Sequence, residues 1–237
     1  MSLAQICRWH IYQNPRDFLE RSASVITRIA EQAIQERGVF KIVLAGGTTP
    51  LAIYEALCSV AMDWTAWHVY FGDERCLPAD HTSRNSVMVS TAFLAHVNIP
   101  KLQVYPIPAE LGPEAGARLY SETLAHVDLF DLVVLGLGED GHTASLFPCH
   151  EWGLTAMSSP TLAVHGAPEP FAERVSLSAW RLSKSRQTLI FVSGEAKASA
   201  VAAWYRKENI PALFITPPSG VDVLTEVSAC KNLLSGV

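Results

Sequence analysis

The stretch that decides the fold is residues 130–148, which read FDLVVLGLGEDGHTASLFP. Residues 131–135 form a short apolar run, the pattern of a strand buried on both faces. The run ends in a glycine-rich turn that contains Glu139 and Asp140, and His142 follows at once. In an open α/β sheet, functional side chains collect where buried strands end in such turns, so we expect the active site here.

The turn GLGEDG at residues 136–141 also matches the G-x-G-x-x-G fingerprint of dinucleotide-binding proteins. We reject this interpretation because two carboxylates occupy positions where a pyrophosphate needs bare N–H groups. In addition, Pro148 limits any following helix to about two turns. His142 has two interpretations: a general base, or a histidine hydrogen-bonded within a tight turn. We expect no cofactor, so the chemistry must come from side chains alone.

The length suits one domain or two small ones, and we expect a single domain spanning residues 1–237. Apolar residues make up 49% of the 237 residues and charged residues 17%, which is enough apolar material for a large core. The net charge of −5 argues against nucleic acid or a membrane surface as a general partner. An anionic small-molecule substrate would therefore have to be held by a local cluster of positive groups.

The cysteines and the N-terminal residues predict a cytoplasmic protein. The five cysteines are odd in number and widely spread, which favours free thiols in a reducing compartment. There is no apolar signal-peptide core and no run of 18 apolar residues. Zinc-ligand spacing and the G-x-S-x-G serine elbow are both absent, so we expect no metal and no serine nucleophile. The oligomeric state stays open between a monomer and a small homo-oligomer.

The rest of the chain alternates between expected strands and helices. This alternation, with buried strands, predicts an α/β fold with a doubly wound, mainly parallel sheet and helices on both faces. The expected helices are 14–37, 86–97, 113–126 and 194–207, and the expected strands are 41–45, 67–71, 102–105, 131–135, 174–178, 187–192, 212–216 and 221–224.

Gly46, Gly47, Thr48 and Thr49 follow the expected strand 41–45 and open a helix. Glycines allow close backbone approach, and a helix N-terminus presents unpaired N–H groups with partial positive charge. The segment is no Walker A loop, because it lacks G-K-[ST]. The segment is therefore an anion-binding loop, or a glycine turn with a threonine as the helix N-cap.

Two further segments carry charged residues at strand or helix ends. Asp73, Glu74 and Arg75 follow the expected strand 67–71, as part of a site or as a solvated turn. Lys197 falls in the first turn of the helix 194–207, where the helix dipole disfavours a cation. A bound anion explains a lysine there; the alternative is a surface lysine that points away.

Five blocks of this sequence resemble, in the right order, those of the 6-phosphogluconolactonase family: AGGTTP (45–50), GDERCLP (72–78), GLGEDGHTASLFP (136–148), RVSLS (174–178) and SGEAKA (193–198). The resemblance extends over nearly the whole chain, and its D-G-H-T-A-S-L-F-P block is long and specific. The same superfamily includes glucosamine-6-phosphate isomerase/deaminase. That type usually has tyrosine where Arg75 stands and N-E-P where S-L-F-P stands, so both differences favour the lactonase.

Three positions depart from the usual family pattern. Thr48 stands for a serine and keeps its hydroxyl. Arg84 stands for a serine before Asn85, and it would either add positive charge near the site or face solvent. Thr225 replaces an aspartate that usually opens the last helix, and we expect it to cap a C-terminal helix.

The resemblance implies hydrolysis of 6-phospho-D-glucono-1,5-lactone to 6-phospho-D-gluconate. His142 would take a proton from water, with Asp140 or Glu139 orienting its imidazole. Arg75 would stabilise the oxyanion. Asp73 or Glu74 would hold Arg75 in place.

The substrate phosphate would sit on Gly46, Gly47, Thr48 and Thr49, with Arg174 and Lys197 closing over it. Three alternatives remain on the sequence alone. They are a sugar-phosphate isomerase or deaminase, a non-catalytic sugar-phosphate sensor, and a structural protein of the same fold. A sensor has no need of His142.

Overall fold

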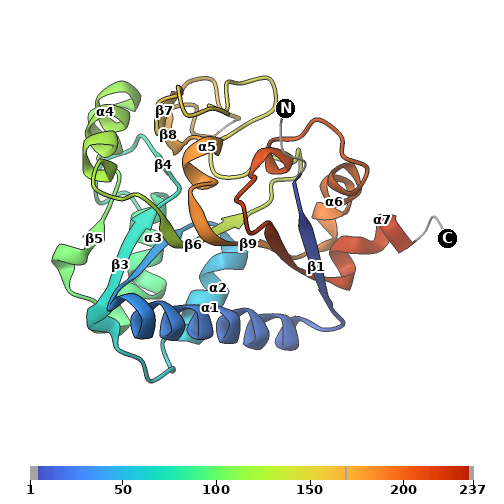
Figure 1. The fold of residues 1–237 in the computed structure, drawn as a ribbon. Coiled ribbons are helices and arrows are strands. Elements are labelled where there is room, and N and C mark those ends of the chain that lie inside the picture. Colours follow the sequence, from blue (N-terminus) through green and yellow to red (C-terminus); the bar gives the residue numbers. More distant parts are fainter. Residues whose placement is uncertain (1–4, 169, 235–237) are drawn as a thin grey trace.

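A parallel sheet of seven strands forms the centre of the protein, whose computed structural model describes residues 5–168 and 170–234 (Figure 1). From edge to edge the order is β1 (Cys7–Tyr12), β10 (Val221–Glu226), β9 (Ser185–Val192), β6 (Phe130–Gly136), β2 (Phe40–Leu44), β3 (Trp67–Phe71) and β5 (Val104–Tyr105). All neighbouring strands in it run parallel. The predicted mainly parallel sheet is therefore confirmed.

Helices cover both faces of this sheet, as the alternating pattern predicted. In Figure 1, α1 and α2 lie along one face, and α5 and a small second sheet lie over the other. The helices are α1 (Pro15–Arg37), α2 (Thr48–Leu57), α3 (Asn85–Ala92), α4 (Pro113–Leu124), α5 (Ala179–Leu182), α6 (Ala198–Tyr205) and α7 (Lys231–Leu234). No helix in the described ranges is long and apolar enough to cross a membrane.

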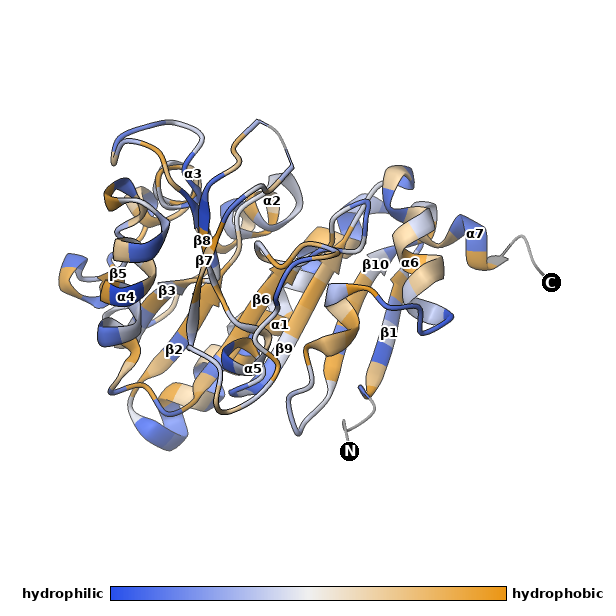
Figure 2. Cartoon of the chain, turned by 90° about the horizontal axis from the view of Figure 1, so that it is seen from above, coloured by the Kyte–Doolittle hydropathy of each residue, from blue (hydrophilic) through white to orange (hydrophobic). Residues whose placement is uncertain are grey.

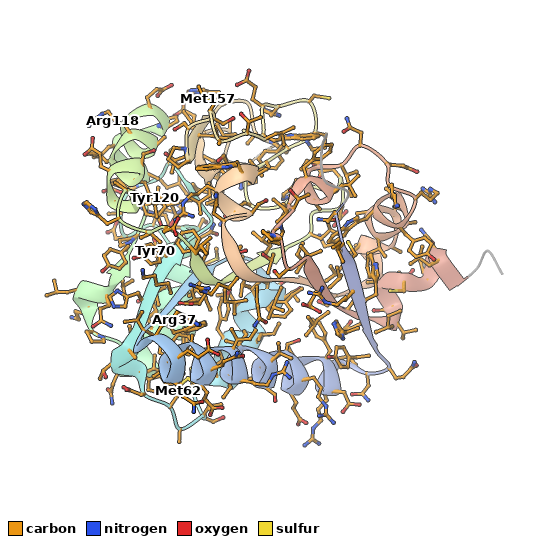
Figure 3. All side chains as sticks on the ribbon, in the orientation of Figure 1. Arg37, Met62, Tyr70, Arg118, Tyr120 and Met157 are labelled. Carbon is orange, nitrogen blue, oxygen red and sulfur yellow. The ribbon has the colours of Figure 1, made fainter. Side chains whose placement is uncertain are left out.

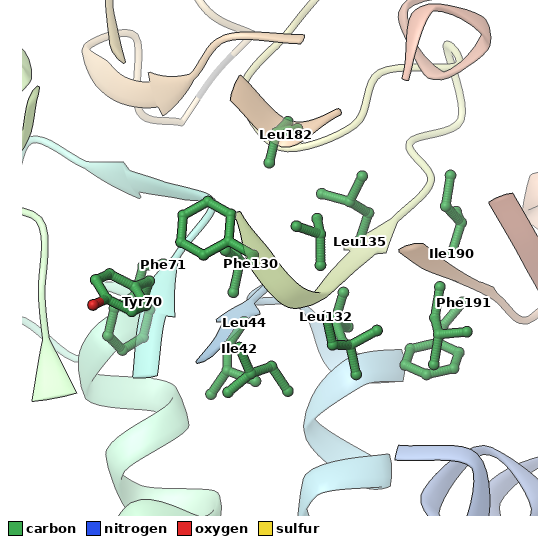
Figure 4. Packing of buried hydrophobic residues seen from close by; sticks show 14 of the residues in the cluster. Ile42, Leu44, Tyr70, Phe71, Phe130, Leu132, Leu135, Leu182, Ile190 and Phe191 are labelled. Atoms are coloured by element: carbon green, nitrogen blue, oxygen red, sulfur yellow. The ribbon is translucent and has the colours of Figure 1, made fainter. Parts of the chain in front are cut away.

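The core is densest around β6, which is buried on both faces. Figure 4 shows Leu132 and Phe191 on the side of α2, and Leu135 and Ile190 on the opposite side beneath Leu182. The hydropathy colours of Figure 2 accordingly show the central strands as apolar and the outer helices as mixed. A strand with both faces covered needs apolar residues at every position, which is why its sequence lacks the alternation of a half-exposed strand.

One charged residue lies within this apolar strand. Asp131 is almost fully buried, and its carboxylate accepts hydrogen bonds from the main-chain N–H of Lys41 (2.8 Å) and from Nε of Arg37 (3.0 Å). Because Lys41 belongs to β2 and Arg37 ends α1, the carboxylate ties these elements to the start of β6. The run that the sequence presents as apolar thus begins with a paired charge, which is the condition for burying one.

The strand order creates a switch point between β2 and β6. These strands are neighbours, but the chain continues from β2 to β3 on one side and from β6 to β9 on the other. Connections that leave in opposite directions cannot cover the strand ends between them, so a crevice opens at the carboxyl ends. The turn after β2 and the turn after β6 are the two that carry the glycine-rich motifs of this chain.

A second sheet stands over these strand ends. It is antiparallel, in the order β4 (Asp73–Arg75), β8 (Arg174–Leu177) and β7 (Thr161–Val164). Gly72 joins the two sheets, because its N–H donates to Leu44 of β2 and its carbonyl accepts from Leu177 of β8. The DER segment was expected either as part of a site or as a solvated turn; the structure places it in a strand, and Asp73 and Arg75 line the cavity described below.

Tyr120 on α4 anchors that helix to the central sheet. Its hydroxyl accepts a hydrogen bond from the N–H of Phe71 at 2.9 Å, and it lies 3.3 Å from the carbonyl oxygen of Tyr105. Figure 3 shows Tyr120 and Tyr70 close together between α4 and β3. The tyrosine hydroxyl thus satisfies backbone groups where β3 and β5 end.

Several element predictions are wrong at the C-terminal end. Residues 212–216 were expected as a strand, but Pro211–Phe214 is a 3₁₀ turn, and its initial proline cannot donate to a strand ladder. Thr225 caps no helix: it is fully buried within β10, and the following turn begins after Glu226.

Strand β1, at the edge of the sheet, was not expected at all. Its alternation of polar and apolar residues is too short to stand out.

Candidate active site

A cavity of about 220 Å³ lies at the switch point, at the carboxyl ends of β2 and β6. Segments from six separate parts of the chain line it, so the fold brings together residues that are far apart in sequence. The predicted site residues that line it are Gly46, Gly47, Thr48, Thr49, Asp73, Arg75, His142, Arg174 and Lys197. Asp140, the remaining one, does not line the cavity and contacts the imidazole of His142 instead.

Asp140 sets the orientation of His142. Its Oδ1 lies 2.6 Å from Nδ1 of the ring and also accepts the main-chain N–H of His142 at 3.0 Å. Because a carboxylate only accepts, the proton of a neutral imidazole belongs on Nδ1, and Nε2 is left as the acceptor. Burial acts to raise the pKa of Asp140, but the hydrogen bonds and charge of His142 lower that pKa overall. Asp140 is therefore ionised at neutral pH. Glu139, the other predicted partner, extends toward Lys197 instead.

Two glycines give the turn its shape. Gly141 has a φ of +84°, in the left-handed region where a side chain is strained. Gly138 does not have a positive φ, but a Cβ there would lie 2.0 Å from Nδ1 of His142 and 2.7 Å from Oδ1 of Asp140. The position must be glycine because the histidine–aspartate pair occupies that space. No helix follows the turn, which is a further difference from a dinucleotide-binding loop.

Phe147 supports two of the functional side chains. The ring centroid of His142 lies 4.6 Å from that of Phe147, and the guanidinium carbon of Arg174 lies 5.3 Å from the same ring centroid. A cation near an aromatic ring gains electrostatic energy while keeping its charge. The S-L-F-P end of the motif thus places a histidine and a cation on the same aromatic ring.

The glycine loop after β2 forms one wall of the cavity. Gly47 has a φ of +94°, and α2 starts at Thr48 without a side-chain cap. The threonine N-cap alternative is therefore wrong, and the N–H groups of the first turn are left without an intrahelical partner. Thr49 Oγ1 lies 2.8 Å from the hydroxyl of Ser193, which follows β9. Hydroxyls and N–H groups at a helix N-terminus suit an anion.

Arg75 and Arg174 are direct neighbours across the second sheet. They pair in the antiparallel register of β4 and β8, so both side chains emerge on the same face, toward the cavity. Burial lowers the pKa of Arg174, although an arginine stays charged in proteins. Two guanidinium groups placed side by side favour a ligand that carries negative charge.

Glu74 supports Arg75 at its main chain, because the Glu74 carboxylate accepts a hydrogen bond from the main-chain N–H of Arg75 at 2.9 Å, but the guanidinium group is held differently. Nη1 of Arg75 donates to the carbonyl oxygen of Ser83 at 2.6 Å, and within the described part of the chain neither carboxylate forms an ion pair with it. Nε of Arg75 is buried and has no protein partner among the described residues. A carbonyl holds the guanidinium without neutralising it, so its full charge is available to a ligand.

Asp73 is held by two other residues. Its Oδ2 accepts a hydrogen bond from the hydroxyl of Ser145 at 2.6 Å, and its Oδ1 accepts one from Nδ2 of Asn85 at 3.0 Å. The same amide nitrogen donates to the main-chain oxygen of Asp73 at 2.9 Å. Oδ1 of Asn85 packs against Gly46, where a Cβ would lie 2.0 Å from it. The first glycine of the loop is therefore needed to accommodate Asn85.

Glu74 points to the other side of β4 and is completely buried. Its carboxylate accepts from the main-chain N–H of Asn85 (2.7 Å) and of Ser86 (2.9 Å), which begin α3, and from the Ser86 hydroxyl (2.7 Å). A carboxylate at a helix N-terminus satisfies orphan donors and complements the dipole. Glu74 thus links β4 to α3.

Arg84 does not face solvent, so that expectation is wrong, and its charge lies behind the site rather than in the cavity. It is 2% exposed; its Nη1 lies 2.7 Å from Glu110 and its Nε 3.4 Å from Glu74. It compensates the buried Glu74 carboxylate from behind the site.

Lys197 lines the cavity as well and lies directly before α6. Its ammonium group is 3.9 Å from the exposed carboxylate of Glu139, a loose ion pair that leaves it able to meet a ligand. The structure therefore brings the predicted cation to the cavity. Within the described residues, Asp73 is the single carboxylate among the cavity-lining groups.

Sequence reasoning missed three polar residues that line the cavity: Asn85, Thr143 and Ser193. Asn85 starts α3, and Ser193 follows the buried strand β9. The signal used for the other turns, a polar residue directly after a buried strand, was present at Ser193. Asn85 gave no such signal, because only the tertiary structure brings the start of α3 against β4 and Gly46.

Comparison with known proteins identifies relatives over most of this chain. The sequence model for glucosamine-6-phosphate isomerases/6-phosphogluconolactonase matches residues 13–224. A protein named 6-phosphogluconolactonase from Synechocystis is 35% identical over 233 residues, covering 93% of this chain and 95% of its own.

Solved structures share the fold. The crystal structure of 6-phosphogluconolactonase from Thermotoga maritima superposes with a TM-score of 0.84 at 25% identity, covering 92% of this chain and 100% of that chain. A monomeric glucosamine-6-phosphate deaminase gives a TM-score of 0.82 at 18% identity, covering 95% of this chain and 99% of that chain. The second likeness shows the fold alone.

Replacing Gly138 by alanine should displace the imidazole of His142, because the added methyl group overlaps Nδ1. We expect the turnover number to fall about 10- to 100-fold, the usual effect of a misplacement near 1 Å. Imidazole ¹⁵N shifts of His142 measured by NMR would report the loss of its hydrogen bond to Asp140. Gly136→Ala is the matched control: a Cβ there meets no atom within 4 Å, so those shifts should stay unchanged. Unchanged shifts in Gly138→Ala would contradict the steric argument.

Proposed function

The chain belongs to the family of glucosamine-6-phosphate isomerases and 6-phosphogluconolactonases. We propose that it hydrolyses 6-phosphogluconolactone with His142 as the general base and Arg75 as the group that stabilises the oxyanion. Its activity is that of a 6-phosphogluconolactonase, which opens 6-phospho-D-glucono-1,5-lactone to 6-phospho-D-gluconate in the pentose phosphate pathway. The observation that carries the mechanism is the orientation of His142, whose Nδ1 is turned to Asp140 beside a cavity lined by Arg75, Arg174 and Lys197.

A lactone is an activated ester, so a positioned water and a base suffice for its hydrolysis. Nε2 of His142 removes a proton from water as the water oxygen attacks the carbonyl carbon. The negative charge that develops on the carbonyl oxygen is met by the guanidinium of Arg75. When the intermediate collapses, the bond from this carbon to the ring oxygen breaks, and the imidazolium returns its proton to that oxygen. The new carboxylic acid then loses a proton to solvent.

The phosphate of the substrate is assigned to the wall formed by Gly46, Gly47, Thr48 and Thr49. First-turn N–H groups of α2 and the threonine hydroxyls donate hydrogen bonds there, and Arg174 and Lys197 supply positive charge. These local charges offset a phosphate dianion in a protein whose net charge is −5. Remote binding energy of this kind also positions the reacting carbonyl.

A cytoplasmic location remains our proposal. All five cysteines are free, and the thiol of Cys149 is exposed, which fits a reducing compartment. A monomer or a small homo-oligomer and a single domain over residues 1–237 likewise remain proposals.

His142→Ala should lose most of the lactonase activity and keep its fold. Removing a general base costs about 10² to 10⁴ in rate. The measurement is a coupled assay with freshly made lactone, run beside glucosamine 6-phosphate as the substrate of the isomerase type. His126→Ala, an exposed histidine outside the cavity lining, is the control. A turnover number within about threefold of the wild type in folded His142→Ala would show that another group is the base.

Arg75→Lys should lower the turnover number roughly 10- to 1000-fold and change product affinity much less. Lysine keeps the charge but loses the planar fork and places its donor elsewhere. Thermal melting of the same preparation separates this from a bracing role. A lower melting temperature with unchanged turnover would mean that the hydrogen bond to Ser83 is the whole function of Arg75.

Lys197→Ala should weaken the binding of 6-phosphogluconate, because it removes a charge-assisted contact worth about 1.5 to 3 kcal/mol. Isothermal titration calorimetry measures this loss directly. The control is Lys184→Ala, whose ammonium lies over Trp180 outside the cavity. Equal affinity of the Lys197 variant and the control would remove Lys197 from the phosphate site.

A further inference from the structure

Asp73 has no role in the mechanism as the geometry stands. It was expected to hold Arg75, but the guanidinium bonds to Ser83 instead. Asp73 is nevertheless 7% exposed, and it lines the cavity as the single carboxylate to do so among the described residues. A carboxylate removed from water is retained only where its oxygens find donors.

Two neutral residues hold this carboxylate in a defined direction. Ser145 donates to Oδ2 and Asn85 donates to Oδ1. The side-chain nitrogen of Asn85 faces Asp73, because two acceptors lie there, the main-chain oxygen and the carboxylate of Asp73. A carboxylate has about four lone-pair sites. These two bonds fill one site on each oxygen, and acceptor capacity is left over toward the cavity.

The other charged groups of the cavity cannot accept hydrogen bonds. Arg75, Arg174 and Lys197 are donors only, and the lone pair of His142 is committed to water in the proposed reaction. The substrate of the proposed function, on which this inference rests, carries hydroxyl groups on its ring besides its phosphate and carbonyl. Those hydroxyls need an acceptor, and a carboxylate is a strong one.

We propose that Asp73 recognises a ring hydroxyl of the sugar lactone, and that Ser145 and Asn85 are positioning residues that aim its carboxylate. Asp73 thereby determines specificity for a lactone whose ring carries hydroxyl groups. The groups that bind the phosphate and the carbonyl do not distinguish such a lactone from one that lacks the hydroxyls. Strand geometry supports this assignment: Asp73 and Arg75 alternate with Glu74 along β4, so the first two face the cavity and Glu74 faces α3.

The test measures whether removing the hydroxyl and removing the carboxylate act on the same interaction. The probes are the 2-deoxy, 3-deoxy and 4-deoxy forms of 6-phosphogluconolactone, with hydrolysis followed by proton release at constant pH. In the wild-type enzyme, loss of the recognised hydroxyl should lower kcat/KM about 10- to 100-fold. In Asp73→Asn that same penalty should shrink to within about threefold, even though activity on the parent lactone also falls.

Ser145→Ala and Ser86→Ala form a matched pair. Each removes a hydroxyl that donates to a buried carboxylate of β4, at 2.6 Å to Asp73 and 2.7 Å to Glu74. The first should reduce the deoxy penalty at least threefold, and the second should leave it at the wild-type value. This pair also decides the question if Asp73→Asn does not fold.

The possible failures are distinguishable. No turnover of the parent lactone by the wild-type enzyme would refute the proposed function itself. Normal turnover of the parent lactone, with all three deoxy penalties unchanged in folded Asp73→Asn or in Ser145→Ala, would overturn only the assignment of Asp73.

Discussion

The site depends on one constraint: the chain connections that follow the neighbouring strands β2 and β6 leave in opposite directions. The two strands are parallel neighbours, yet their connections leave to opposite sides of the sheet. A crevice follows at their carboxyl ends, because no single connection can cover both. The glycine loop after β2 and the histidine turn after β6 form two walls of it, and the second sheet brings Arg75 and Arg174 across the opening. The cavity-lining residues are thus placed by a rigid frame, although several of them lie on turns.

The alternation of side chains along β4 separates two acidic residues that are adjacent in sequence. Asp73 faces the cavity, whereas the fully buried Glu74 binds the first N–H groups of α3 and has Arg84 beside it. An unpaired carboxylate in that position would cost several kcal/mol. Because backbone and hydroxyl donors replace water around Glu74, its hydrogen bonds link the second sheet to α3. The same link places Asn85, the first residue of α3, between Asp73 and the glycine loop.

The charge of the site opposes the charge of the molecule. The chain is acidic overall, but its cavity gathers two guanidinium groups and an ammonium group around one carboxylate. In the proposed reaction, the phosphate and the developing oxyanion both meet positive charge in this cavity. The hydrogen bond between Nδ1 of His142 and Asp140 leaves the free lone pair on Nε2, on the side of the ring that faces away from the carboxylate.

The sequence by itself determined the parallel α/β fold, the glycine loop and the histidine turn, because each depends on local patterns. Buried strands lack alternation, and glycine marks the turns where backbone approaches closely. Arg75 and Lys197 were recognisable at strand and helix ends, and Arg174 through the family resemblance. Only the tertiary structure decided what each charged side chain contacts. Arg75 binds a carbonyl, Arg84 turns inward to Glu74 and Glu110, and Asp73 meets Ser145 and Asn85. The physical reason is that these partners come from other segments and are chosen by distance and burial, quantities that no local pattern of residues contains.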